Sequence, residues 1–324
     1  MATTTSNLQA LAAAWGVGNE YQPIVVDLLK RSSLLQTATV AKASHGIKHK
    51  FRYFNSLPTA AFREIGEGIV PQKVDVNTAQ IDLKELVFDL FDDYQAILQY
   101  PGGKEGWLKD NYTAALAALT NALAKAVFYG NIPSFGYEKA FKGFHQYAKD
   151  LGQVIAQKGA NTAYRSSIFA VRWDEFDGAS LRFNNTELLQ VIDMTPNQPI
   201  PIVTDTTTNK QMNIFKWIFS AYFTLIIPSA KSVAVITQID TSHLPTADDM
   251  NALIDAVEAD SGNTVIYCNA TARRAIATIK DGKLNMYAES SDYNNNVATW
   301  RGVPIYREDA LVATETTDLD YLPS

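Results

Sequence analysis

The chain has 324 residues, 47% of them hydrophobic, and carries a formal net charge of −6 at pH 7 with a pI of about 5.3. This apolar content can fill a sizeable core. The net negative charge argues against a protein whose main function is to bind nucleic acid, because phosphate binding needs concentrated lysine and arginine. A single cysteine, Cys268, excludes an intramolecular disulfide framework and predicts an intracellular protein.

The first 45 residues are predicted to form an N-terminal arm with one amphipathic helix, which begins after Pro23. No basic cluster leads into an apolar stretch of signal-peptide length, so secretion is not expected. The most apolar run of the chain, 214–227, is interrupted by Lys216, ends before Pro228, and is too short to cross a bilayer as a helix. We therefore predict no membrane segment.

An alternating pattern begins at Ile47 and predicts a strand with one apolar face and one basic face. The basic positions are Lys48, Lys50 and Arg52. Glycines and a proline then interrupt regular structure, and no compact apolar pattern resumes before Ile81. We predict a long protruding hairpin over 46–92, called the extended loop below.

The return limb of this hairpin fits two patterns, because its apolar residues from 83 to 98 match a helical stripe, while Ile81 and Leu83 also match a strand. We predict a strand that runs into a short helix. The charges of the return limb are mostly acidic, and those of the outgoing limb are basic. The acidic residues are Asp75, Asp82, Glu85, Asp89, Asp92 and Asp93, and Arg63 and Lys73 add to the outgoing basic residues.

These opposite charges leave two arrangements open. They can form ordinary cross-strand pairs within the hairpin, each worth roughly 0.2–1 kcal/mol, or they can pair between neighbouring subunits. The candidate contacts between subunits are Lys48, Lys50, Arg52, Arg63, Asp82, Glu85, Asp89 and Asp92.

The clearest helix follows Pro101-Gly102-Gly103, with apolar residues at three- and four-residue steps from Leu108 to Val127. Gly130 and Asn131 form a suitable stop. We predict a helix over about 105–129, around 35 Å long at about 1.5 Å per residue. The following stretch, 132–162, is expected to be loop with short helical pieces.

Strands dominate the next segment. Alternation from Ile168 to Trp173 and from Leu181 to Phe183, with a turn at Asp177-Gly178, predicts a hairpin. Further strands are expected over three ranges, namely 188–192, 213–227 and 232–239.

The last third mixes helices and strands and predicts a small α/β subdomain. Thr246 and Asp249 form a capping box that opens a helix. A strand over 264–268, a helix over 271–279 closed by Asp281-Gly282, and a final strand over 303–306 are expected to follow.

Enzyme signatures are largely missing from the sequence. It contains no nucleophile elbow, P-loop, Rossmann glycine fingerprint or paired-histidine zinc helix. The histidines have no partner at metal-ligand spacing, and Cys268 lies in an apolar strand where a buried, inert thiol is expected. Asp89, Asp92 and Asp93 lack the glycine-containing loop of a calcium site. We predict no catalytic residue, no metal and no cofactor.

The order of the predicted elements resembles the Hong Kong 97-type fold of tailed-bacteriophage major capsid proteins. Three local motifs strengthen this resemblance, which spans about Leu28 to Leu311. Leu57-Pro58-Thr59-Ala60-Ala61-Phe62-Arg63 is similar to the extended-loop signature of one branch of that family. Phe128-Tyr129-Gly130-Asn131 resembles the end of its spine helix, and Gly302-Val303-Pro304-Ile305 with Arg307 and Asp309-Ala310-Leu311 resembles its C-terminal strand.

The resemblance implies an α+β fold divided into five regions. They are the N-terminal arm (1–45), the extended loop (46–92), a peripheral domain with a spine helix (93–204), a mixed α/β axial domain (205–299) and a C-terminal strand that returns to the peripheral domain (300–324). The peripheral strands would come from 168–192 and from residue 303 onward.

The implied function is that of a major capsid protein, which self-assembles into hexamers and pentamers of an icosahedral shell around double-stranded DNA. Such a protein is a virion component assembled in the host bacterial cytoplasm. Because the chain begins with a short arm, we expect a separate scaffolding protein, besides a portal protein, a decoration protein and weak, non-specific contact with packaged DNA. The alternatives are an encapsulin-type compartment shell, an unrecognised soluble hydrolase that uses the acidic cluster, and another virion component such as a tail or cement protein.

Overall fold

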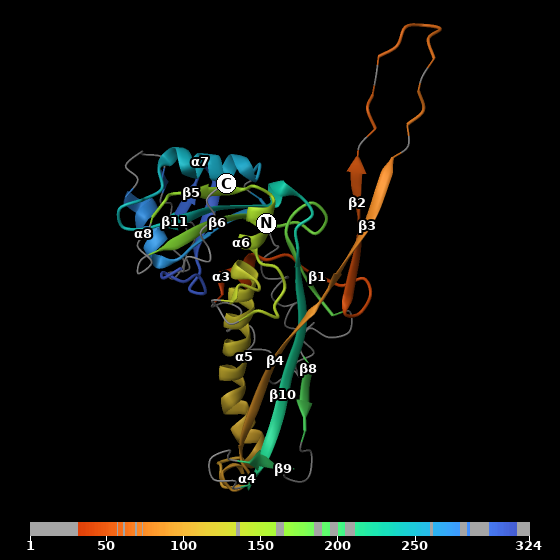
Figure 1. Ribbon diagram of the computed structural model, residues 1–324. Coiled ribbons are helices and arrows are strands. Elements are labelled where there is room, and N and C mark those ends of the chain that lie inside the picture. The colour runs from red at the N-terminus through yellow and green to blue at the C-terminus, as the bar shows by residue number, and fades with distance from the viewer. Residues whose placement is uncertain are drawn as a thin grey trace.

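The computed structural model describes residues 32–56, 58–60, 62–68, 70–72, 74–133, 137–159, 165–184, 190–194, 200–204, 211–259, 262–278, 284–285 and 298–315. It has three parts: an elongated stalk, a lobe at one end of the stalk, and a hairpin that projects away from both (Figure 1). The helix predicted after Pro23 and the turn predicted at Asp281-Gly282 lie outside the described residues.

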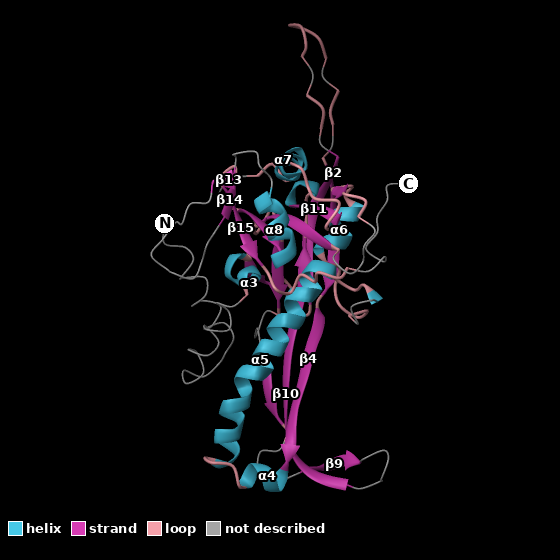
Figure 2. Cartoon of the chain, turned by 90° about the vertical axis from the view of Figure 1, so that its left-hand side faces the viewer, coloured by secondary structure: helices cyan, strands magenta, loops and turns pink. Residues whose placement is uncertain are grey.

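The stalk is built on α5 (Gly103–Tyr129), a helix of 27 residues and about 40 Å in length. The helix begins after Gly102 and ends before Gly130. Both glycines have a positive φ, 83° and 69°, which suits glycine. Two long strands, β4 (Lys84–Asp93) and β10 (Gln211–Ile226), run beside it (Figure 2). The predicted long helix is confirmed.

Alternate side chains of β10 face α5 and form the stalk core. These buried residues are Phe215, Trp217, Phe219, Ala221 and Phe223. From the helix, Trp107 stacks on Trp217 with ring centroids 5.2 Å apart, and Tyr112 contacts Phe219 at 5.4 Å. The alternation follows from strand geometry, in which successive side chains point to opposite faces.

The stalk strands belong to a six-stranded sheet centred on β10. Its main order is β1 (Val40–Lys42), β7 (Ser180–Phe183), β10 and β4, and β8 (Gln190–Asp193) and β9 (Ile200–Thr204) also pair with β10. The β4 pairing is antiparallel and runs from Ile214 opposite Asp93 to Phe223 opposite Lys84. At sixteen residues, β10 is long enough to hold these partners at different positions along its length.

The lobe contains a seven-stranded sheet. Its order is β13 (Leu284–Asn285), β14 (Ala298–Trp300), β15 (Val303–Arg307), β12 (Thr264–Cys268), β6 (Ser166–Arg172), β11 (Val233–Ile239) and β5 (Val154–Ala156). A short 3₁₀ helix, η2 (Ala230–Ser232), leads from β10 into β11.

Each face of the lobe sheet is covered by helices. Ile168 and Ala170 of β6 pack in one apolar cluster with α7 (Ala247–Ala256) and α8 (Ala270–Thr278). Phe169 and Val171, the alternate residues, pack in the other cluster with the end of α5 and with α6 (Phe144–Asp150). Because both faces are covered, β6 is apolar at successive positions rather than alternating.

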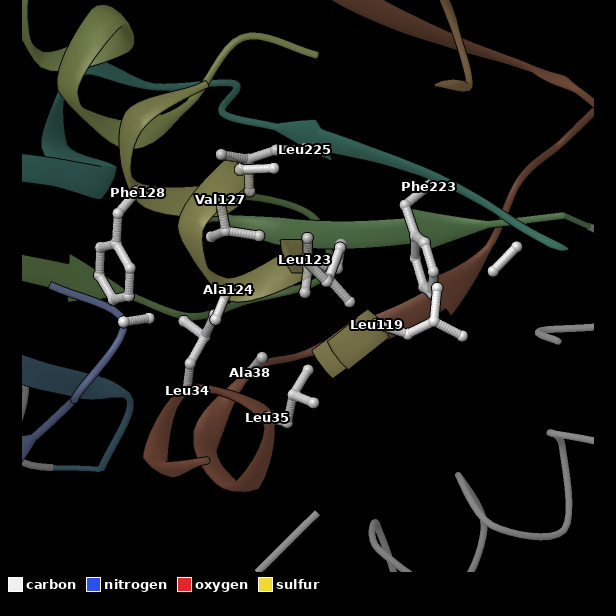
Figure 3. Close-up of a cluster of buried hydrophobic side chains, with 14 of the residues drawn as sticks. Leu34, Leu35, Ala38, Leu119, Leu123, Ala124, Val127, Phe128, Phe223 and Leu225 are labelled. Atoms are coloured by element: carbon white, nitrogen blue, oxygen red, sulfur yellow. The ribbon is translucent and has the colours of Figure 1, made fainter. Parts of the chain in front are cut away.

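The N-terminal end of the described chain is hydrogen bonded to a segment near its C-terminal end. Helix α3 (Ser33–Thr37) places Leu34, Leu35 and Ala38 against α5 near Ala124 (Figure 3). At its first turn the buried carboxylate of Glu308 accepts hydrogen bonds from the Ser33 hydroxyl at 2.8 Å and the Leu34 N–H at 2.9 Å. Segments about 275 residues apart thus share one buried polar contact.

The projecting hairpin consists of β2 (Lys48–Ser56) and β3 (Asp75–Asp82), which form a separate two-stranded sheet. After it the chain continues through β4 into α4 (Tyr94–Leu98), whose N-terminus is capped by Asp93. The prediction of a strand running into a short helix is confirmed, and the alternative helical stripe is wrong because β4 pairs with β10.

Several other elements match their predictions. The strand over 264–268 and the capping box of Thr246 and Asp249 are confirmed, as are the helix and strand that follow them. Strands are also confirmed within 190–192, 213–226 and 233–239. In the stretch expected to be loop with short helical pieces, α6 is present, and β5 was not predicted.

The hairpin predicted over 168–183 is wrong. Its two strands are joined by a turn, but β6 lies in the lobe sheet and β7 in the stalk sheet. An isolated bridge between Trp173 and Ala179 marks the place where they separate. The turn predicted at Asp177-Gly178 is present, but a turn does not by itself determine which strands pair.

The last strand lies in the lobe sheet. There β15 pairs with β12 and β14, and the same sheet contains β6, which was also expected among the peripheral strands. Conversely, β10, which was assigned to the axial region, forms the centre of the stalk sheet. The region boundaries remain predictions, and hydrogen-bonded sheets cross those drawn at 205 and 300.

Candidate assembly surface

The projecting hairpin has a defined register. Lys48, Lys50 and Arg52 share one exposed face of β2, opposite Asp82, Gln80 and Thr78 respectively. Only Lys48 faces an acid, and its Nζ lies 3.9 Å from Asp82 Oδ1, with side chains 49% and 61% exposed. An exposed pair at this distance contributes little to stability.

Lys50 and Arg52 stand opposite neutral residues, and within the described ranges no ion pair involves either of them. Among the described residues, pairing between the two limbs is therefore observed at Lys48 and Asp82. The basic strip of Lys48, Lys50 and Arg52 is largely uncompensated by the described part of the chain.

The base of the hairpin is held by short-range bonds. The Leu83 N–H donates to Ile47 O at 2.9 Å, and the Lys50 N–H donates to Ser44 Oγ at 2.8 Å. The Ser44 N–H donates to His49 Nδ1 at 3.2 Å, and burial, followed by the charges of Arg182 and His45, lowers the pKa of His49. These contacts position the hairpin where it leaves the body.

The far end of the hairpin exposes large apolar side chains. Phe62 and Ile65 are fully exposed, and Val70 is 79% exposed. Arg63 donates to the carbonyl of Glu67 at 2.8 Å and so helps to shape the tip. Grouped apolar side chains on a surface mark contact sites, and the sequence motif around Phe62 indicated the loop but not this exposure.

The predicted acidic contacts lie mainly on β4, away from the basic strip. Asp89 Oδ2 is 2.7 Å from Lys216 Nζ on β10, and Glu85 is hydrogen bonded to the hydroxyl of Tyr222, which raises the pKa of that tyrosine. Asp92 accepts a bond from the Asp93 N–H at 2.8 Å. The structure therefore brings these acids together with β10, not with Lys50, Arg52 or Arg63.

A further apolar surface lies on the stalk face turned away from α5. Val87 and Phe91 of β4 are each 48% exposed, and Ile192 of β8 is 37% exposed. On β4 the exposed side chains alternate with Leu86, Phe88 and Leu90, which pack against the core. The sequence pattern contained the signal, since β4 is apolar on both faces, as in a sheet covered on both sides.

The described residues were compared with what metal binding and thiol chemistry require. No group of three or more histidine, cysteine, aspartate or glutamate residues there could hold a metal ion. Burial raises the pKa of Cys268 to about 12, so its thiol is protonated at neutral pH. None of the described helices is long and apolar enough to span a membrane.

Comparison with known proteins gives a consistent result. The family model described as major capsid protein GP7 matches residues 18–317. A chain from the structure of bacteriophage Epsilon15 aligns with 18% identity and a TM-score of 0.60 over 86% of this chain and 87% of that one. A chain from the bacteriophage JBD30 capsid decorated with minor capsid protein trimers aligns with 15% identity and a TM-score of 0.50 over 87% and 91%. A search of curated proteins found no match.

Proposed function

Since this chain belongs to the family of the major capsid protein GP7 and is a shell-forming capsid protein of the Hong Kong 97-type fold, we propose that it forms the hexamers and pentamers of an icosahedral phage head. The shell encloses double-stranded DNA, and the protein acts without catalysis. It is a virion component, assembled in the cytoplasm of the host bacterium.

The projecting hairpin carries this proposal. Two strands and a connecting segment extend from the body (Figure 1), with Phe62 and Ile65 fully exposed at the end. A hairpin of two strands is marginally stable by itself, and exposed apolar side chains favour association. In this proposal a neighbouring subunit supplies the surface that the described part of the chain does not give these side chains.

The charged residues of the hairpin and of β4 act at the same contacts. The basic strip of Lys48, Lys50 and Arg52, together with Arg63, meets acidic side chains of a neighbour. The acidic candidates are Asp82, Glu85, Asp89 and Asp92. Complementary charges of this kind set register and speed encounter more than they add affinity, which suits repeated assembly of identical subunits.

Other proteins complete the particle in this proposal. A separate scaffolding protein guides assembly, a portal protein occupies one vertex, and a decoration protein binds the shell. The JBD30 capsid is decorated with minor capsid protein trimers. Contact with packaged DNA is weak and non-specific, which agrees with the net charge of −6.

Charge reversal tests the proposal. The variant Lys48→Glu, Lys50→Glu, Arg52→Glu should fail to form particles while keeping the circular dichroism spectrum and melting temperature of the wild type. A control that reverses three exposed charges elsewhere should still assemble. It changes Lys109, Lys158 and Arg274 to glutamate.

Size-exclusion chromatography and negative-stain electron microscopy give the readout. The wild-type chain, co-expressed with its scaffold, should yield capsomers or large particles. A strictly monomeric product would contradict the shell function, and substrate turnover by that monomer would favour a hydrolase. Loss of fold in the hairpin variant would instead place its charges within one subunit.

A further inference from the structure

The turn between β6 and β7, residues 174–178, presents Phe176 to solvent at 85% exposure. Asp174 Oδ1 accepts the N–H of Phe176 at 2.8 Å and that of Asp177 at 3.0 Å, and these bonds lower the pKa of Asp174. A Cβ at Gly178 would lie 2.4 Å from Asp174 N, so only glycine closes the turn in this form. An exposed aromatic ring thus sits on a closely bonded turn.

Two largely buried arginines support this turn from behind. Arg182 donates to Glu175 O at 2.7 Å and to Glu175 Oε1 at 3.2 Å, and Arg172 donates to Asp177 Oδ2 at 2.9 Å and Asp177 O at 3.2 Å. Their side chains are 8% and 16% exposed. Charge-assisted bonds are strong, and a turn already ordered loses little conformational entropy when a partner covers it.

A hollow on another part of the chain has matching chemistry. Its volume is about 340 Å³, and it lies between α5, the beginning of β4 and residues 137–141. Its apolar lining includes Leu86, Leu123, Ala126, Phe141 and Phe223. The exposed charged residues of its lining are Lys84, Glu85, Glu138 and Lys139, two of each sign. A second hollow of the same volume is lined by polar side chains, among them Lys142 and Lys149, and does not suit a phenyl ring.

We propose that Phe176 of one copy inserts into the hollow of a second copy; this contact rests on the proposed shell function. The phenyl ring meets the apolar lining. Because two acids and two lysines lie among the lining residues, the apolar fit and not the charge carries the contact. An aromatic anchor in an apolar pocket is typical of the residues that carry most of an interface's energy.

The proposed contact can repeat in two ways. Because Phe176 and the hollow are different parts of the same chain, each copy both donates a ring and receives one, either reciprocally in a two-fold dimer or from copy to copy around a ring. The proposed hexamers and pentamers require the second arrangement, which is heterologous. Covalent multimers larger than a dimer in the experiment below distinguish the two.

Disulfide trapping tests this contact in the full chain, under conditions where the wild type forms particles. In Phe176→Cys with Ala122→Cys, one thiol replaces the ring and the other lies in the hollow. Oxidation should give a ladder of covalent multimers on a non-reducing gel, whereas either single variant stops at the dimer. Cys268 is buried, and its raised pKa keeps its thiol out of this reaction.

Two further pairs make the test specific. Leu98→Cys with Ala122→Cys, which uses an exposed apolar residue of α4, should give no ladder. Phe62→Cys with Ala122→Cys tests whether the hairpin tip fills the hollow instead. A ladder from the Phe62 pair and none from the Phe176 pair would overturn the proposal.

Assembly yield provides a second measurement. Phe176→Ser should lower the yield of particles at least tenfold with an unchanged melting temperature, and Leu244→Ser, another exposed apolar residue, should leave the yield unchanged. Wild-type particles without a Phe176 ladder would refute this contact and leave the shell function standing. Failure of the wild type itself to assemble would refute both.

Discussion

Replacing Glu308 by alanine should loosen the join between the N-terminal and C-terminal ends of the described chain. Glu308 is 5% exposed, and its Oε2 accepts bonds from Ser33 Oγ, Leu34 N and Ser32 Oγ at 2.8, 2.9 and 3.4 Å. Its Oε1 accepts the Ala310 N–H at 3.3 Å. Alanine removes every one of these acceptors from a buried site.

The magnitude follows from the donors left behind. A buried donor without an acceptor costs about 1–3 kcal/mol. The Leu34 and Ala310 N–H groups lose their bonds to Glu308, whereas the Ser33 hydroxyl keeps the Arg307 carbonyl at 3.0 Å. We expect Glu308→Ala to lower the free energy of unfolding by about 2–4 kcal/mol, after partial relaxation. Glu308→Gln keeps the shape and one carbonyl oxygen and should lose about 1 kcal/mol.

Urea unfolding of the unassembled subunit, followed by tryptophan fluorescence, measures this loss. Amide hydrogen exchange in residues 33–37 should accelerate in the same variant, because those residues lose their C-terminal partner. Asp309→Ala is the matched control: its carboxylate is 77% exposed and pairs only with Arg307 among the described contacts, so the change should be below about 0.5 kcal/mol. A Glu308→Ala variant as stable as this control would refute the reasoning.

Three further predictions concern the interior. Trp217→Ala should cost about 3–5 kcal/mol of unfolding free energy by urea titration, whereas Leu98→Ala, at an exposed site, should cost below about 0.5 kcal/mol. Cys268 should react with a thiol reagent at pH 8 only on unfolding, because burial raises its pKa to about 12; rapid reaction of the native chain would contradict this. Burial, followed by the charge of Lys149, lowers the pKa of His145 to about 4, so its contribution to stability is complete above pH 6.5 and is lost as pH falls toward 4. His145→Phe should flatten the pH dependence by up to about 3 kcal/mol across that window, and an unchanged slope would contradict the assignment.

Local elements were predictable where one physical signal dominated. The apolar periodicity of α5 and its flanking glycines predicted a helix that the structure extends to Gly103–Tyr129. The capping box of Thr246 and Asp249 located the start of α7 because it depends on residues three apart. The strand Thr264–Cys268 was recognisable from its uninterrupted apolar run.

Pairing between distant strands was not predictable in the same way. The sequence of the turn 174–178 does not determine that β6 and β7 lie in different sheets. Their pairing depends on β10 and β11, more than thirty residues further along the chain. The place of β15 likewise depends on β12. Local patterns specify strands, whereas their partners are specified by packing across the whole core.

The candidate contact residues were likewise predictable only in part from local sequence patterns. Alternation placed Lys48, Lys50 and Arg52 on one face of β2, and the structure has them there. The sequence left open whether the acids of β4 pair with this strip in the same subunit or in a neighbour, and within the subunit Asp89 pairs with Lys216 of β10. Exposure of Phe62 and Phe176 depends on what the rest of the fold leaves uncovered, so no local pattern reported it.

The buried bond between α3 and Glu308 has a consequence for the order in which the subunit is made. During synthesis, residues 33–37 leave the ribosome long before Glu308. In the lobe sheet, β12 cannot pair with β15 until β15 has been synthesised. Contacts between such distant segments form late, because a long loop must close first. A nascent chain therefore completes its body only after Glu308 and β15 have been synthesised, which delays the appearance of a subunit ready to assemble.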